Sequence, residues 1–287
     1  MDIDVKQLQD PEFWRHRCPD LRVSESMALE ELCPQTCPTI QPEHWETCQI
    51  TIHQDGYFAY DGWFAAELID RLADCFDRLE EVGLPPAFCF VFDEAWILIQ
   101  QLAPLLDELV ADYCFLPAMW AWHVTSETQT AFAPHRDQVR DVGTEDDEHL
   151  DYLTFWIPLT DLNHLSSCIS VLPASADPDY DQGTTETTIH NLQDVRTLQG
   201  SKGSVFCWAT GLIHWGTKQS SLGEPRKSIG IYTQNPESEC YDPPPIDLTQ
   251  AYSLSQRLAM IGQQIYNYSR GADEKLLSVA NQLLSQE

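Results

Sequence analysis

Residues 132–137 read Phe-Ala-Pro-His-Arg-Asp, and this stretch decides which fold to expect. It ends an aromatic run, and a polar loop and then strongly apolar segments follow it. His135 and Asp137 stand two positions apart, so in an extended chain their side chains point to the same side. Two further His-x-Asp matches begin at His53 and His149, but one lies far upstream of the strand-rich region and the other runs directly into a strand. We therefore expect His135 and Asp137 to share a metal ion.

A lone histidine and an arginine twelve residues beyond it complete the candidate site. His214 follows an expected strand, and the turn before Arg226 would fold the next strand back beside it. Two imidazoles and one carboxylate leave half of the coordination sphere of an octahedral ferrous ion open. Arg226 and Ser228 share one strand face, where a guanidinium and a hydroxyl can grip a carboxylate. The pattern predicts Fe(II) on His135, Asp137 and His214, with 2-oxoglutarate on Arg226 and dioxygen as the other cosubstrate.

Length and composition indicate one large folded domain. The chain has 287 residues, of which 43% are hydrophobic and nine are tryptophan. It contains no apolar run of about 18 residues, so we expect no membrane span. The N-terminus lacks the features of a signal peptide, and the ten cysteines are scattered. We expect reduced thiols and a cytoplasmic location.

The net charge of −29 restricts the partners. It argues against nucleic acids and anionic membranes, since both would be repelled and no basic footprint exists. Such a surface either serves solubility or steers a cationic or amine substrate towards the protein. The acids spread along the whole chain, which favours solubility.

The periodicity of apolar residues divides the chain into three parts. Residues 1–47 are expected to form an N-terminal arm, residues 48–235 the main domain, and residues 236–287 a linker with helices that pack on that domain. Apolar residues recur every three or four positions over 62–82 and 94–113, which predicts two helices, the second kinked or split at Pro104.

From residue 115 onwards the apolar period changes to two, which is typical of strands. Pro158 suggests an edge strand or a bulge. The expected strands are 119–124, 152–160, 168–172, 187–192, 203–208, 213–219 and 227–234. A mostly β protein with flanking helices follows, with a double-stranded β-helix (jelly-roll, cupin-like) core.

Several of these segments resemble the phytanoyl-CoA dioxygenase family. They are residues 55–58, 132–137, 153–161, 170–173, 203–206 and 214–226, so the resemblance covers roughly residues 48–235. It implies a double-stranded β-helix that uses Fe(II), 2-oxoglutarate and dioxygen. By this resemblance His135, Asp137 and His214 match the metal ligands, Arg226 matches the partner of the distal carboxylate of 2-oxoglutarate, and Trp156 matches an aromatic residue beside the cosubstrate.

The chain departs from the family pattern at two places. Ser166-Ser167-Cys168 stands where the family commonly has Asn-Gly, and Arg136 is unusual inside the metal motif. Both positions border the family's substrate cavity, and no basic cluster for coenzyme A phosphates is present, so phytanoyl-CoA is disfavoured. Asp137 stands where halogenating relatives carry a small residue, which favours hydroxylation, desaturation or a related oxidation.

The sequence therefore favours an oxygenase that oxidises a small organic molecule, such as a specialised metabolite, an amino acid or a carrier-bound acid. Residues 120–122 (Trp-Ala-Trp) should supply much of the cavity wall, and the acids between Asp137 and Tyr152 could contact an amine on the substrate. Two alternatives stay open. One is a peptide or protein hydroxylase, and the other is a non-catalytic cupin-like binding protein.

Overall fold

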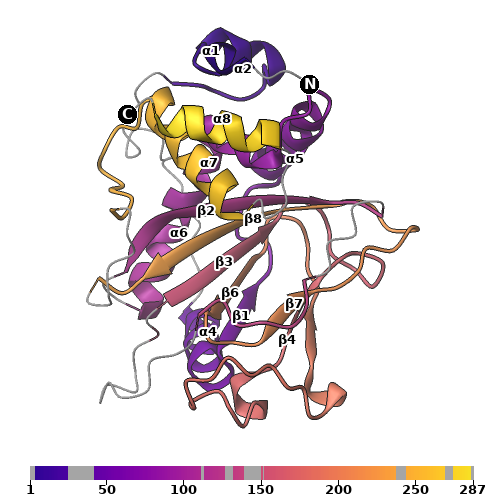
Figure 1. The fold of residues 1–287 in the computed structure, drawn as a ribbon. Helices are drawn as coiled ribbons and strands as arrows, with labels where there is room; N and C mark the ends of the chain where they lie inside the picture. Colours follow the sequence, from indigo (N-terminus) through magenta and orange to yellow (C-terminus); the bar gives the residue numbers. More distant parts are fainter. Residues whose placement is uncertain are drawn as a thin grey trace.

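Two antiparallel sheets with flanking helices make up the protein (Figure 1). The computed structural model describes residues 4–24, 42–110, 113–126, 132–138, 150, 152–236, 244–268 and 274–285. The larger sheet has the order β1-β6-β3-β8-β2, and the smaller sheet has the order β5-β4-β7. The strands are β1 (Tyr57–Tyr60), β2 (Cys114–Val124), β3 (Tyr152–Pro158), β4 (Ile169–Val171), β5 (Arg196–Leu198), β6 (Val205–Ala209), β7 (His214–Gly216) and β8 (Arg226–Gln234).

The larger sheet lies between the helices and the smaller sheet, and the side chains of strand β3 pack on both sides of it. Leu153, Phe155 and Ile157 belong to the apolar core shared with the helices, whereas Trp156 belongs to a second core shared with the smaller sheet. Side chains alternate between the two faces of a strand, so a strand covered on both faces is apolar throughout. The second core, between the two sheets, is the one that adjoins the candidate site.

Helices cover the outer side of the larger sheet. They are α1 (Val5–Leu8), α2 (Pro11–Arg17), α5 (Ala66–Glu80), α6 (Asp93–Val110), α7 (Leu254–Tyr268) and α8 (Glu274–Leu284), together with the short 3₁₀ helix η1 (Pro86–Val91). Helix α4 (Pro42–Asp55) instead packs next to β1 (Figure 1). The expected helices at 62–82 and 94–113 are confirmed, and α6 continues unbroken through Pro104. The arm boundary expected at residue 47 falls inside α4.

Two strand predictions were wrong. Residues 187–192 pair with no described strand, and they lead into a 3₁₀ turn, Leu192–Asp194, that Asn191 caps. The consecutive β-branched residues Thr187, Thr188 and Ile189 favour a strand, but Leu192 is largely exposed and no face of the segment is buried. Pro158 marks neither an edge nor a bulge, because β3 lies between β6 and β8. It is the last residue of the strand, and its carbonyl accepts a hydrogen bond from the Gly203 N–H at 2.8 Å.

The two ends of the chain meet at Arg257 in the first turn of α7. Its guanidinium donates to the carbonyls of Val91 (2.5 Å) and Ser24, and pairs with Asp93 Oδ1 at 3.0 Å. The Ser24 hydroxyl donates to the other oxygen of Asp93 at 2.6 Å. Asp93 and Arg257 are fully buried, so removing either would leave a buried charge unpaired. This node fixes the N-terminal segment, α6 and α7 to one another.

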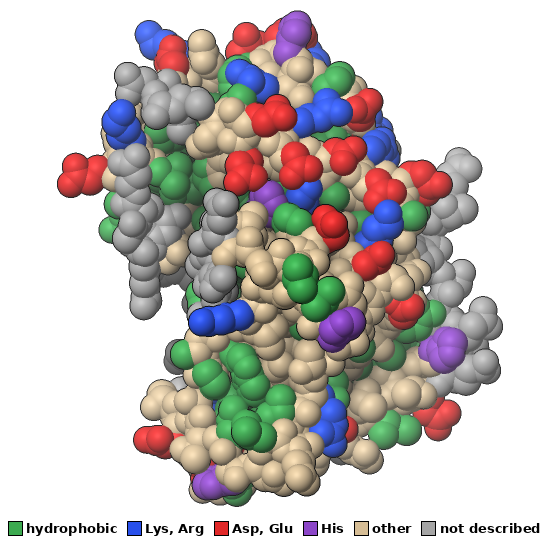
Figure 2. Space-filling model, turned by 90° about the vertical axis from the view of Figure 1, so that its right-hand side faces the viewer, with side chains coloured by type: hydrophobic (Ala, Val, Ile, Leu, Met, Phe, Trp, Pro, Cys, Tyr) green, Lys and Arg blue, Asp and Glu red, His purple; other side chains and the backbone are tan. Residues whose placement is uncertain are grey.

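Acidic side chains are spread over the face seen in Figure 2. In its upper half they alternate with lysine and arginine, and the lower half shows a group of hydrophobic side chains. Some of the charges pair across elements, such as Lys202 with Asp70 and Lys227 with Asp77. Within the described residues, no helix is long and apolar enough to cross a membrane. The cysteines of this part of the chain are all free thiols.

Candidate metal centre

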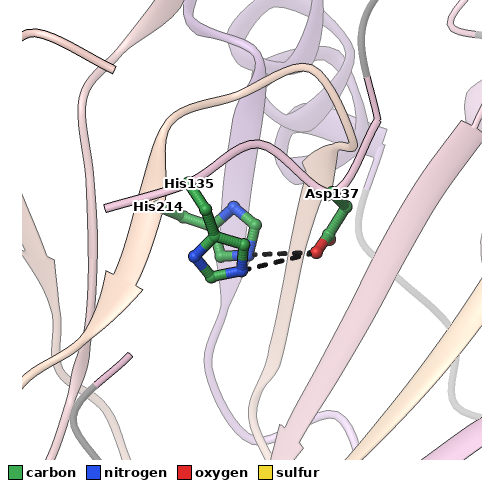
Figure 3. Close-up of side chains that lie close together, drawn as sticks. All are labelled: His135, Asp137 and His214. Carbon is green, nitrogen blue, oxygen red and sulfur yellow. Dashed lines mark ion pairs between the residues drawn. The ribbon is translucent and has the colours of Figure 1, made fainter. Parts of the chain in front are cut away.

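His135, Asp137 and His214 lie together with their polar atoms facing one another (Figure 3). Nε2 of each histidine is 3.6 Å from Oδ1 of Asp137. The three possible ligand atoms all lie within 4.8 Å of one another. Two nitrogens and one oxygen on one face are a donor set that suits an octahedral metal with open positions.

Backbone pairing brings these residues together. His135 and His214 form an antiparallel bridge, with N–H···O distances of 3.0 Å and 2.9 Å in the two directions. The Asp137 N–H donates to the Thr210 carbonyl at 2.9 Å, which continues the pairing. With the chain extended here, residues 135 and 137 point to the same side. The two histidines are therefore held by the fold before any metal binds.

Hydrogen bonds also fix the orientation of each ligand. Nδ1 of His135 lies 2.8 Å from the Ala133 carbonyl, and Nδ1 of His214 lies 3.0 Å from the Leu212 carbonyl. A carbonyl only accepts, so Nδ1 carries the proton and the Nε2 lone pair is left for a metal. Thr154 Oγ1 donates to Asp137 Oδ2 at 3.0 Å, which leaves Oδ1 facing the histidines.

The electrostatics favour the protonation states that a metal needs. Burial would raise the pKa of Asp137, but His214, His135 and the Thr154 hydroxyl together lower it. Burial lowers the pKa of His214, which keeps that ring neutral. The neighbouring Asp137 carboxylate raises the pKa of His135, so a proton would compete with a metal there as the pH falls.

Thr154→Val should weaken metal binding on the order of tenfold to a hundredfold, because the partners that orient a ligand carry such effects. The change keeps the shape of the side chain and removes the hydroxyl that holds Asp137. Metal affinity can be measured by titration with Fe(II) under nitrogen. Thr197→Val is the matched control, since that hydroxyl pairs with Ser170 outside the site. Equal affinity in the two variants would contradict the role of Thr154.

A cavity of about 140 Å³ lies beside the three ligands, and Arg226 is part of its wall. Arg226 is only 2% exposed. Its Nη1 donates to the Ser167 carbonyl at 3.2 Å, and its guanidinium carbon lies 5.4 Å from the ring centroid of Trp156. Nε is buried without a hydrogen-bond partner among the described residues, none of whose carboxylates forms an ion pair with Arg226.

Burial lowers the pKa of Arg226 to about 10, so the group stays charged at neutral pH. A buried charge without a counter-ion is costly, and such groups are normally paired. The cavity thus presents an unpaired cation at one side and two histidines with a carboxylate at another. An acid with two anionic ends would match both.

Trp156 and Ser228 take different positions around Arg226. Trp156 lines the cavity and lies beneath the guanidinium. Ser228 is fully buried on the same face of β8, and its hydroxyl has no partner among the described residues. It does not line the cavity. Ser228 stands opposite Trp122 and Pro158 of the neighbouring strands, which explains its burial.

Arg136 does not border the cavity, contrary to expectation. Its side chain turns away, donates to the carbonyls of Gly211 (2.6 Å) and Glu186 (3.2 Å), and pairs with Asp177 at 2.8 Å. Both side chains of the pair are almost fully buried. Arg136 therefore ties the strand that carries His135 and Asp137 to the turn that precedes His214. Sequence reasoning missed this role because nothing near Arg136 in the chain marks its partners.

Arg136→Met should destabilise the protein by on the order of 3–5 kcal/mol, because Asp177 would remain buried without its cation. The expected result is a lower urea midpoint together with weaker Fe(II) binding. The double variant Arg136→Met/Asp177→Leu should recover much of the stability, since the stranded charge is gone. If the single variant unfolds at the same urea concentration as the parent, the ion pair has no such role.

The other candidate ligands lie elsewhere. His53 is exposed on α4, and its partner Asp55 accepts a hydrogen bond from Ser175 at 2.5 Å. His149, Asp151 and most of the acidic loop before Tyr152 lie outside the described residues. A second group, Asp77, Glu80 and His123, is close enough to hold a cation, but the Lys227 ammonium already lies 2.6 Å from Asp77.

Comparisons with solved structures identify the fold. SnoN, a non-heme alpha ketoglutarate dependent epimerase from nogalamycin biosynthesis, matches with a TM-score of 0.52 and 15% identity, over 75% of this chain and 99% of SnoN. The non-heme monooxygenase ThoJ matches with a TM-score of 0.56 and 12% identity, over 84% of this chain and 100% of ThoJ. AviO1 from Streptomyces viridochromogenes Tue57 matches with a TM-score of 0.52 and 17% identity, over 72% of this chain and 100% of AviO1.

The fold is shared with non-heme alpha ketoglutarate dependent enzymes. SnoN has also been solved with Fe3+, alpha ketoglutarate and nogalamycin RO. No protein-family model matches the sequence. No curated protein matches it either. At the identities found, the likeness concerns the fold, and the function has to be argued from the site.

Proposed function

We propose that the protein is an Fe(II)- and 2-oxoglutarate-dependent oxygenase, built on a double-stranded β-helix, that oxidises a small organic molecule. One observation carries this proposal. The cavity is bordered both by the face of His135, Asp137 and His214 and by the Arg226 guanidinium, which pairs with no described carboxylate. The two-sheet fold shared with SnoN and ThoJ supports it.

The residues present fit the implied group. His135 and His214 would each offer an Nε2 lone pair, and Asp137 would offer Oδ1, which leaves room for a bidentate ligand and dioxygen on an octahedral ion. Bound there with 2-oxoglutarate, ferrous iron supplies the oxidising chemistry, with succinate and carbon dioxide as coproducts. The protein's own part is to place the reactants and exclude water.

Arg226 would hold the carboxylate of 2-oxoglutarate that points away from the metal. Its guanidinium is planar, and Nε is left without a partner, which suits a charge-assisted hydrogen bond to a carboxylate. Trp156 keeps the arginine in place from below and keeps water from it. Ser228, two residues further along the same face of β8, would assist Arg226 in holding this carboxylate, since its hydroxyl has no partner among the described residues.

Two finer assignments belong to the same proposal. The order of motifs from residue 55 to residue 226 supports a place near the phytanoyl-CoA dioxygenase family. The carboxylate of Asp137, which the Thr154 hydroxyl orients, would occupy the coordination position on iron that a halide needs in a halogenating enzyme. We therefore infer oxygen insertion or hydrogen removal rather than halogenation.

The test is loading with Fe(II) and 2-oxoglutarate under nitrogen, followed by exposure to dioxygen with a panel of small molecules. Succinate release that one substrate triggers is the expected result, and isotopically labelled dioxygen should mark a hydroxylated product. The reaction should run in chloride buffer, because a chlorinated product would contradict the role of Asp137. Turnover that is undiminished without 2-oxoglutarate would reject the proposed function.

A further inference from the structure

Apart from the metal-binding face and Arg226, the cavity wall is mainly aromatic. Seven aromatic side chains from six parts of the chain line it: Trp120, Trp122, Phe132, Trp156, Trp208, Tyr232 and Tyr268. Flat ring faces and apolar edges favour a flat, ring-shaped partner, because aromatic pairs are attractive when stacked with an offset or edge to face. The aromatic wall thus favours flat ligands, a preference that the metal-binding residues do not supply.

The formal charges in and around the cavity cancel once Fe(II) and 2-oxoglutarate are bound. Among the described residues, Arg226 and Asp137 are the only lining side chains, besides the histidines, that can be charged. A ferrous ion brings two positive charges and 2-oxoglutarate brings two negative ones, so the loaded cavity is neutral. A neutral cavity with mainly aromatic walls offers no spare opposite charge to compensate the lost hydration of a charged substrate.

The position of Trp122 is set by the neighbouring strand. A Cβ atom at Gly230 would lie 2.7 Å from the indole ring of Trp122, so the absent side chain makes room for that ring. On the open side, Phe132 is 49% exposed and Tyr268 is 39% exposed. The Tyr268 ring lies 5.1 Å from the ring of Trp120 at an interplanar angle of 31°. The aromatic wall therefore extends from the three candidate metal ligands to the surface.

We propose that the substrate is an uncharged molecule with at least one planar ring, which enters between Phe132 and Tyr268 and stacks against Trp122. This inference rests on the proposed function, and it names the substrate class of the same site. An amine is disfavoured, because a cation would have to approach the Arg226 guanidinium and the ferrous ion. A carboxylate substrate is disfavoured, because Arg226 is the one arginine or lysine on the described wall and 2-oxoglutarate would occupy it.

Three probes with one ring system separate the charge classes. They are 2-naphthalenemethanol (neutral), 2-naphthoate (anionic) and (2-naphthylmethyl)trimethylammonium (cationic). Binding is measured by equilibrium dialysis under nitrogen, on protein loaded with Fe(II) and 2-oxoglutarate, so no turnover is needed. The measurement is made at physiological ionic strength, at which the Debye length is about 8 Å. This limits non-specific attraction of the cationic probe to the acidic surface of the protein.

The neutral probe should bind at least tenfold more tightly than either charged probe. Trp122→Leu should weaken its binding on the order of threefold to tenfold, because a stacked ring is replaced by an aliphatic side chain. Trp45→Leu is the matched control, since Trp45 is half-buried on α4 and does not line the cavity. Phe132→Ala offers a second variant at an exposed position, should Trp122→Leu fail to fold.

The result separates this inference from the proposed function. Binding of Fe(II) and 2-oxoglutarate is measured first on the same sample, and its failure would reject the oxygenase assignment. If both bind, tightest binding of the cationic or anionic probe would overturn the substrate class. So would the absence of binding by all three probes, or an equal loss in Trp122→Leu and Trp45→Leu.

Discussion

Arg226→Leu is expected to lower the affinity for 2-oxoglutarate at least tenfold while the affinity for Fe(II) stays unchanged. The leucine leaves the distal carboxylate in a buried position without its cation, a loss on the order of 2–5 kcal/mol. In the absence of 2-oxoglutarate the same variant should be no less stable than the parent, because Arg226 is buried without a described carboxylate partner. Titration under nitrogen and thermal unfolding measure the two effects.

Two further variants sharpen this test. Arg226→Lys keeps the charge and loses the planar fork, so its affinity should lie between those of the parent and the leucine variant. Arg196→Leu is the control on an exposed arginine whose hydrogen bonds, among the described residues, go to the carbonyls of the three residues before it. Unchanged 2-oxoglutarate affinity in Arg226→Leu would remove this residue from the site.

Asp137→Ala should weaken Fe(II) binding by at least about a hundredfold and abolish turnover while the fold is kept. Loss of a partner that merely orients a ligand costs up to that much, so loss of a ligand should cost no less. Added Fe(II) should raise the unfolding temperature of the parent, because a ligand that binds only the folded state stabilises it. The same addition should leave the unfolding temperature of Asp137→Ala nearly constant.

His135→Ala and His214→Ala should behave in the same way, whereas His53→Ala should bind Fe(II) like the parent. His53 provides a useful control because it belongs to the same His-x-Asp pattern but is exposed on α4. Unchanged iron occupancy in His135→Ala and His214→Ala would show that the metal lies elsewhere.

The proximity of the four polar site residues could be predicted because local rules place them. Strand periodicity sets His135 beside Asp137, and one turn sets Arg226 near His214. The same periodicity could have pointed to Thr154, which is two residues before Trp156 on β3. The partners of Arg136 could not be foreseen, because Asp177 and Gly211 reach it only through tertiary folding. Tyr268 has no sequence signal at all, since it joins the cavity from the end of the closing helix.

The fold shows the same division. Helices α5 and α6 followed from their apolar stripes, and most strands followed from the period of two. The strand prediction failed at residues 187–192, where three consecutive β-branched residues favour a strand but no described strand pairs with the segment. Periodicity reports what a segment could bury, and only the complete fold decides what covers it.

Helix α7 runs from the N-terminal segment around Ser24 to the cavity wall. The helix carries Arg257 in its first turn and Tyr268 at its end. Its 15 residues span about 22 Å at a rise of about 1.5 Å per residue. Opening of the Arg257 node would release Ser24 and Asp93, so we expect these segments to open together. A molecule that packs on Tyr268 would slow amide hydrogen exchange along α7 and, through Arg257, in the segment around Ser24. Slower exchange around Ser24 would show that the described N-terminal residues, none of which lines the cavity, are coupled to it.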